Sequence, residues 1–194
     1  MTMNDFTFYW TEGWRHIMSR GAVDHILFIA ALALIHSLSD WKRVVVLVTA
    51  FTLGHALTLL LSVTDVIRFP VEWVEFLIPC TIAATAAFNL FQSRPTVGTF
   101  RLNYLMAFVF GLVHGMGYAN AIRFMLAREQ SLWKALLAFN LGLEVGQIFV
   151  ILTVLAVSHV VCGIPGVRRV WWVVTMSSLI LIASLLIAWE RIPF

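Results

Sequence analysis

Residues 21–38 read GAVDHILFIAALALIHSL, an apolar run that carries Asp24 and His25 side by side near its start. An ionised carboxylate in hydrocarbon costs several kcal/mol or more, so membrane segments rarely hold one without a partner or a function. Further ionisable residues fall inside other apolar stretches, namely His55, His114 and Glu144. Imidazole and carboxylate groups bind metals and carry protons, so these residues together predict a functional site at membrane depth.

The composition is that of a membrane protein rather than a soluble domain. The chain has 194 residues, of which 61% are hydrophobic and 12% are charged. Soluble domains are about half apolar and about a quarter charged. The net charge of +3 comes from Lys and Arg scattered over the connecting segments, without a basic stripe or motif, so we expect no nucleic-acid partner. Cys80 and Cys162 are too few for a disulfide framework and lack metal-site spacing.

Hydropathy predicts an all-α membrane protein, a bundle of about six transmembrane helices in one polytopic domain over residues 1–194. The predicted spans run near 22–39, 43–64, 71–92, 103–126, 132–161 and 168–189. Lys and Arg divide almost evenly between the two sides that these spans create, so the sequence does not predict the orientation.

Residues 1–20 are aromatic, mixed in charge and too short and polar to span a membrane alone. We expect them to form an interfacial segment that lies on the membrane or tucks into the mouth of the bundle. They lack the apolar core and small-residue cleavage site of a signal peptide. The sequence therefore predicts no cleavable signal peptide, and the bilayer itself is the first partner.

Helical spacing groups the polar residues of the predicted spans. Asn140, Glu144 and Gln147 are three or four residues apart and so form one polar stripe on a helix. Asp24 and His25 are adjacent and point about 100° apart. We therefore expect only one of them to bind a metal directly. Asp24 is the favoured metal ligand or proton carrier, and His25 is either a metal ligand or an outer partner.

Neutral imidazole with carboxylate is a ligand set for zinc, nickel, cobalt or iron. The predicted metal ligands are Asp24, His25, His55, His114 and Glu144. The predicted outer or peripheral residues are His16, Glu75, Asn140 and Gln147. The competing interpretation is a set of interhelical hydrogen bonds, each worth about 0.6–2 kcal/mol. Ionisable groups at membrane depth more often serve function, so the purely structural network is the less favoured interpretation.

The relevant stretches are GWRHIMSRGAVDHILF, FTLGHALTL, VEFLIPCTIAATAAFNL, FGLVHGMGYA and FNLGLEVGQ. Together, and in this order over nearly the whole chain, they resemble the shorter branch of the HupE/UreJ family of hydrogenase- and urease-accessory membrane proteins. The family's polar positions fall on His16, Asp24, His25, His55, Glu75, His114, Asn140, Glu144 and Gln147. Ala56 departs from the family, which often has Ser after the histidine of the second span.

The resemblance implies a bacterial inner-membrane (cytoplasmic-membrane) protein that binds and moves nickel or a related divalent metal. It also implies metalloenzyme maturation proteins or a homo-oligomer as partners. The favoured function is therefore a nickel or related divalent-metal permease or accessory protein. Nickel rests on the resemblance, and zinc is equally compatible with the ligand types.

The alternative function is an intramembrane zinc-dependent hydrolase that acts on a lipid or a membrane peptide. Three protein ligands and a water, with Glu144 or Glu75 as general base, would suit that chemistry. The chain has no HExxH, GxSxG, Walker A or CxxC motif, so the enzyme interpretation is the less favoured one. The sequence leaves open the metal, the substrate, the coupling ion, the orientation and the oligomeric state.

Overall fold

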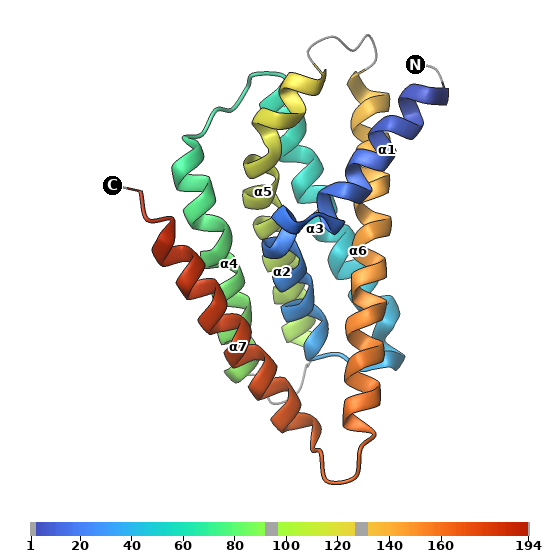
Figure 1. Cartoon of the computed structure of the whole chain (residues 1–194), viewed down its shortest axis with the longest axis vertical. Coiled ribbons are helices and arrows are strands. Elements are labelled where there is room, and N and C mark those ends of the chain that lie inside the picture. The colour runs from blue at the N-terminus through green and yellow to red at the C-terminus, as the bar shows by residue number, and fades with distance from the viewer. Residues whose placement is uncertain (1–2, 92–96, 127–131, 194) are drawn as a thin grey trace.

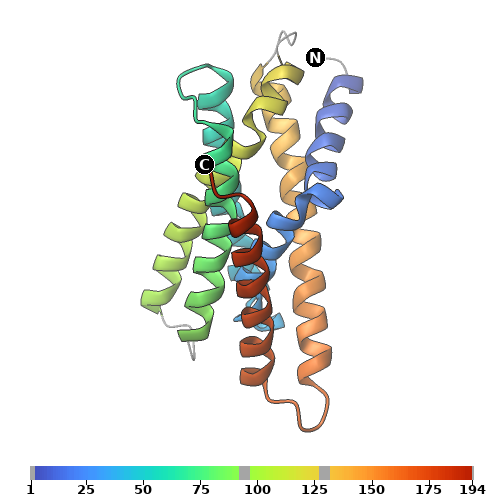
Figure 2. The same cartoon turned by 60° about the vertical axis from the view of Figure 1, so that its left-hand side comes forward.

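The computed structural model describes residues 3–91, 97–126 and 132–193, and this part of the chain is helical without a strand. The long helices are α1 (Met3–Met18), α2 (Val23–Leu34), α3 (Trp41–Val63), α4 (Val71–Phe91), α5 (Val97–Leu126), α6 (Leu132–Cys162) and α7 (Arg169–Glu190). Short 3₁₀ turns at Arg20–Ala22 and Leu38–Asp40 flank α2. The helices form an elongated bundle (Figures 1 and 2). The predicted all-α membrane fold is confirmed.

Among the described residues, five segments are long and apolar enough to cross a membrane. They are Leu38–Val63, Val71–Phe91, Arg101–Ala119, Leu132–Cys162 and Arg169–Glu190. A sixth crossing exists only if α1 and α2, which are bent by 72° at the break between them, count as one broken span.

The first predicted span, near residues 22–39, is therefore wrong as a continuous helix. The α2 helix has 12 residues, which at 1.5 Å per residue reach about 18 Å, against a hydrocarbon core of about 30 Å. Counted together with α2 as one broken span, α1 would supply the missing length; its Glu12 and Arg15 keep the hydropathy of that stretch low. Residues 3–18 form α1, which packs along α6 and keeps much of its surface half-buried or exposed; the interfacial placement of residues 1–20 stays a prediction.

The α1 helix is held in the bundle by close backbone contact with α6. Gly13 of α1 faces the carbonyl oxygen of Phe139, and Gly142 of α6 faces the carbonyl oxygen of Trp10. A methyl group at either glycine would overlap that oxygen. Small residues that let two backbones approach are a common basis of helix association in membranes, where water does not drive apolar surfaces together.

Glycines also allow close backbone contact between α3 and α5. Gly54 of α3 lies against the backbone of Phe108, and Gly115 of α5 lies against the backbone of His55. These contacts place the imidazole of His55 and the neighbouring turn of α5 within one tightly packed crossing. The position of His55 is therefore set by backbone contact rather than by side-chain packing alone.

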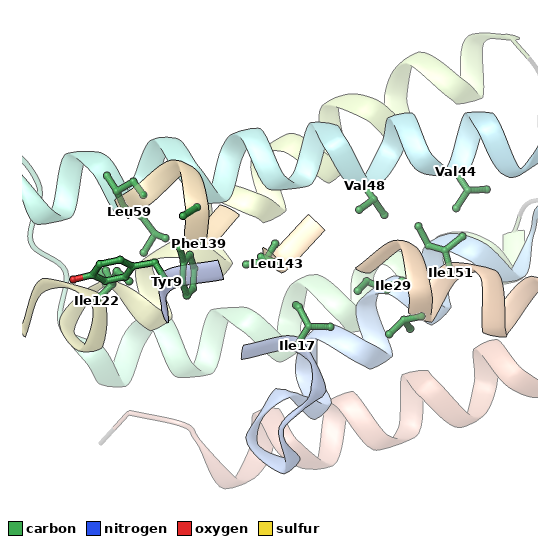
Figure 3. Close-up of a cluster of buried hydrophobic side chains, with 14 of the residues drawn as sticks. Tyr9, Ile17, Ile29, Val44, Val48, Leu59, Ile122, Phe139, Leu143 and Ile151 are labelled. Atoms are coloured by element: carbon green, nitrogen blue, oxygen red, sulfur yellow. The ribbon is translucent and has the colours of Figure 1, made fainter. Parts of the chain in front are cut away.

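The α2 helix lies at the centre of the bundle and is buried on most of its surface (Figure 1). Ile29 and Ala33 face one apolar cluster, shared with α1, α3, α5 and α6, whose side chains converge in Figure 3. Phe28 and Leu32 face a second cluster, shared with α3, α4, α5 and α7. Beyond Asp24 and His25 in its first turn, α2 is apolar on all sides, and such a helix belongs in an interior, which explains why this short segment is surrounded by other helices.

The glycine contacts give a stability prediction. Gly142→Ala and Gly54→Ala should each destabilise the protein by about 1–3 kcal/mol, the usual cost of overpacking, because the added methyl group overlaps a backbone carbonyl. Thermal unfolding in detergent measures the effect. Gly21→Ala is the control, because its new methyl group would meet only the Ser19 Oγ atom at 3.9 Å. Equal melting temperatures for all variants would contradict this account of the packing.

Candidate metal centre

The break between α1 and α2 brings two histidines together. His16 lies in the last turn of α1, and His25 lies in the first turn of α2. Their ring centroids are 4.7 Å apart, with one ring edge-on to the other. Broken helices at membrane depth occur where the backbone is buried in protein or lines a cavity. Here the break turns residues nine positions apart into direct neighbours.

His55 of α3 completes a group of three imidazoles. Its ring centroid lies 5.8 Å from that of His16 and 6.1 Å from that of His25. Each of the three side chains offers a nitrogen, and these nitrogens all lie within 4.8 Å of one another. We call His16, His25 and His55 the histidine trio. Its members come from three helices, so the site depends on the bundle and not on one local motif.

The nitrogens of these histidines are buried and lack hydrogen-bond partners. This holds for Nε2 of His16, Nε2 of His25 and both nitrogens of His55. Leaving a buried polar atom without a partner costs about 1–3 kcal/mol, and the great majority of such atoms in folded proteins are paired. Neutral imidazole nitrogen is a ligand for zinc, nickel, copper and iron, so the donor set of the trio fits a divalent transition metal.

His114 of α5 adds a fourth imidazole beside the trio. Its ring centroid is 5.2 Å from that of His25. Its Nδ1–H donates to the carbonyl oxygen of Phe110 at 2.8 Å, which leaves Nε2 buried, without a partner and available as a ligand. The rings of Phe28 and Phe51 lie 5.2 and 5.1 Å from that of His114. Aromatic rings therefore hold the His114 imidazole in place on this side of the site.

A cavity of about 350 Å³ opens beside the histidines, and we call it the vestibule. Its polar lining includes His16, Asp24, His25, Glu75, His114 and Arg191. Arg191 donates from Nη1 to Oδ2 of Asp24 at 2.8 Å. The Oδ1 atom of Asp24 is buried and has no hydrogen-bond partner. The vestibule thus combines carboxylate oxygens with imidazole nitrogens at the edge of the dry trio.

The adjacent pair, Asp24 and His25, points in two directions, as helical geometry requires. His25 belongs to the trio, whereas Asp24 pairs with Arg191 in the vestibule. The arrangement therefore differs from the expected preference for Asp24 over His25. His16, expected at the periphery, lies in the trio because the helix break carries it there.

Glu144 lies apart from the trio, in a groove between α3 and α6. Thr49 donates from Oγ1 to the Glu144 carboxylate at 2.6 Å. The groove has a volume of about 330 Å³, and Glu144 and Asn140 line it among mostly apolar side chains. The structure thus brings His16, His25, His55 and His114 together with Asp24 and Glu75 nearby, and it places Glu144 on another surface.

The polar stripe of α6 faces α3. Thr52 donates from Oγ1 to Oε1 of Gln147 at 2.7 Å. Asn140 donates from Nδ2 to the carbonyl oxygen of Leu136 at 2.8 Å, and its side chain also interacts with His55. Neither His55 nitrogen reaches full hydrogen-bond geometry in this arrangement. Asn140 is thus the member of this polar stripe that borders the trio, next to the ring of Phe139, which packs against His16 and His55.

Sequence reasoning missed two residues of the site. Arg191 follows the last residue of α7 and looks like an ordinary cation at a membrane surface. A buried aspartate signals that some cation must pair with it, but not which one. Tyr118 packs against His16 with ring centroids 4.1 Å apart and stacks on Phe139 at 5.3 Å. No periodicity distinguishes it from a packing aromatic residue.

Comparison with protein families gives one result for the chain as a whole. A family model described as HupE / UreJ protein matches residues 1–191. Neither the curated proteins nor the solved structures contain a match. The resemblance identified from five short stretches is therefore confirmed over essentially the full length.

The geometry predicts which substitutions remove metal. His55→Ala should lower the affinity for Ni²⁺ or Zn²⁺ by more than about 10–100-fold. Removing a residue that only hydrogen-bonds to a metal ligand already costs about that much, and His55 is itself a proposed ligand. Glu144→Gln should retain the metal, because Glu144 lies in the α3–α6 groove. Elemental analysis of the purified variants, with protein concentration from amino-acid analysis, measures the stoichiometry. Loss of metal from Glu144→Gln together with retention by His55→Ala would place the site elsewhere.

Proposed function

The chain belongs to the HupE/UreJ family, and on that premise we propose that it binds a divalent transition metal within the membrane and moves it across. Nickel is the ion that the family resemblance implies. The observation that carries the proposal is the histidine trio, in which each residue offers one nitrogen within 4.8 Å of the other two. Nε2 of His16, Nε2 of His25 and both nitrogens of His55 are buried without full hydrogen-bond partners, which a network of interhelical hydrogen bonds does not explain.

In this proposal the ion is the cargo, and the side chains act in sequence. Asp24 and Glu75 in the vestibule attract the cation, since formal negative charge in a cleft raises the local cation concentration. His16, His25 and His55 then replace its water with nitrogen ligands. His114 offers the next nitrogen, beside His25. Neutral imidazoles suit transient binding, because they add no charge that would hold the ion permanently.

The surroundings of the trio favour transfer over permanent storage. Three helices supply the trio and a fourth supplies His114, so a small shift between helices changes the ligand set. The break between α1 and α2 offers a place for such a shift. In known transporters, broken helices at the membrane midplane form the sites where ions bind.

The cellular setting belongs to the same proposal. A bacterial cytoplasmic membrane would let the protein deliver nickel to metalloenzyme maturation proteins. A second copy of the chain is the other expected partner. Both assignments follow from the family rather than from the geometry of the site.

A zinc-dependent hydrolase is the second candidate, and one observation favours it. The vestibule of about 350 Å³ is lined by Glu75 together with His16, His25 and His114, and three protein ligands with room for a water and a nearby carboxylate describe catalytic zinc sites. The zinc-loaded protein should then cleave a lipid ester or a membrane peptide, and Glu75→Gln should abolish cleavage. Mass spectrometry of mixed lipid and peptide substrates provides the readout. Undiminished cleavage by Glu75→Gln would remove Glu75 from that role.

Uptake into liposomes tests the transport proposal. Vesicles containing the purified protein should accumulate ⁶³Ni²⁺ faster than empty vesicles. His55→Ala should reduce uptake to the level of empty vesicles, because it removes a trio ligand. His159→Ala is the control, since His159 is an exposed histidine near the end of α6. Bound metal without uptake above empty vesicles would contradict the permease function while leaving metal binding intact.

A further inference from the structure

The ion pair between Asp24 and Arg191 joins the entrance of the site to the end of the chain. Asp24 lies in the first turn of α2, and Arg191 follows the last residue of α7. The pair is unequal in exposure, because the Asp24 side chain is 11% exposed and the Arg191 side chain is 35% exposed. The guanidinium can therefore return to water more easily than the carboxylate can.

The vestibule is large enough for an ion that still carries water. One water takes about 30 Å³ of liquid volume, so six waters around a small divalent ion need about 180 Å³. The vestibule volume is about 350 Å³. Its lining residues Asp24, His25 and His114 each also have one polar atom that is closed off from solvent and has no hydrogen-bond partner, namely Oδ1, Nε2 and Nε2. A hydrated ion in the vestibule therefore first meets the Asp24–Arg191 pair and the exposed Glu75.

The formal charges of the vestibule lining do not balance. With Asp24 and Glu75 at −1 each, Arg191 at +1 and the histidines neutral, the sum over these lining residues is −1. A divalent ion beside Arg191 brings the sum to +1. A divalent ion with Arg191 withdrawn brings it to zero. In a medium of low dielectric constant, the arrangement without excess charge is favoured.

We propose that Arg191 and the incoming divalent ion compete for Asp24, so that a hydrated cation in the vestibule displaces the Arg191 guanidinium before reaching the histidine trio. The proposal rests on the proposed function and adds an entry step to it. Arg191 acts as a built-in competitor that sets the apparent affinity of the site. Monovalent ions displace it poorly, because their single charge only replaces that of the guanidinium.

Calorimetric titration with Ni²⁺ tests the competition in the full-length protein. Arg191→Gln should bind Ni²⁺ about fivefold more tightly, the equivalent of losing one partly exposed ion pair as competitor. Arg191→Lys keeps the charge and should bind more weakly than Arg191→Gln. Arg43→Gln is the matched control, because Arg43 also pairs with an aspartate, Asp40, at 3.1 Å but lies about 18 Å along α3 from His55.

The double variant separates competition from a general charge effect. In the Asp24→Asn background, Arg191→Gln should change the affinity much less than in the wild type, since the group competed for is gone. Unchanged or weaker binding by Arg191→Gln, or an equal effect in both backgrounds, would overturn the proposal. Absence of Ni²⁺ binding by the wild type would instead refute the proposed function itself.

A second measurement uses the unaltered chain and does not depend on how a variant folds. Trypsin cleaves after arginine, and displacement of Arg191 should expose the bond to Ile192. Ni²⁺ should therefore accelerate loss of the last three residues from the wild-type chain, as followed by intact-mass spectrometry. A free peptide of sequence ERIPF, cleaved in the same tube, corrects for effects of Ni²⁺ on trypsin. Equal cleavage with and without Ni²⁺, after that correction, would overturn the proposal.

Discussion

The close backbone contact between α1 and α6 is the constraint on which the rest of the structure depends. Without the glycine contacts at Gly13 and Gly142, a helix that carries Glu12 and Arg15 would have little reason to enter the bundle. With them, α1 packs along α6, and the short α2 continues the chain from its end into the middle of the bundle (Figure 1). The break then falls within the bundle, where protein and a polar cavity surround its free backbone groups.

The break between α1 and α2 brings together buried imidazoles that destabilise the protein and can bind a metal. Imidazole nitrogens buried without partners cost about 1–3 kcal/mol each, and the trio with His114 contains several of them. A protein selected only for stability would replace such side chains with leucine or pair them. The tight α3–α5 crossing at Gly115 and His55 holds these imidazoles in place despite that cost. A ligand that coordinates the nitrogens recovers this free energy on binding.

The sequence predicts the continuous spans well, and the reason is physical. For α3, α4, α6 and α7 the predicted bounds lie within a few residues of the observed helices, because length and hydropathy decide where such helices begin and end. The first span fails because its upper half is stabilised by contact with α6, which hydropathy does not measure. His16 was expected at the periphery for the same reason, since helical periodicity does not extend across a break.

Pairing between distant residues is the other quantity that periodicity does not provide. The stripe of Asn140, Glu144 and Gln147 was predicted to share a face, and these residues do all lie toward α3. Periodicity does not say which member borders the trio, and only the packing of α3 on α6 places Asn140 there. Likewise, the cost of burying Asp24 predicts a cation but not Arg191, which lies 167 residues away.

The two carboxylates at membrane depth therefore have different surroundings, and this limits what each can do. Asp24 shares a cavity with Arg191 and with two trio histidines, His16 and His25. A change of charge at Asp24 therefore changes the electrostatic potential at those imidazoles. Glu144 accepts a hydrogen bond from Thr49 in a mostly apolar groove. It connects to the trio indirectly, through α3, which carries both Thr49 and His55, and through α6, which carries Asn140 beside His55. A role for Glu144 in moving metal thus requires a shift of α3 or α6, whereas Asp24 can act by exchange of partners alone.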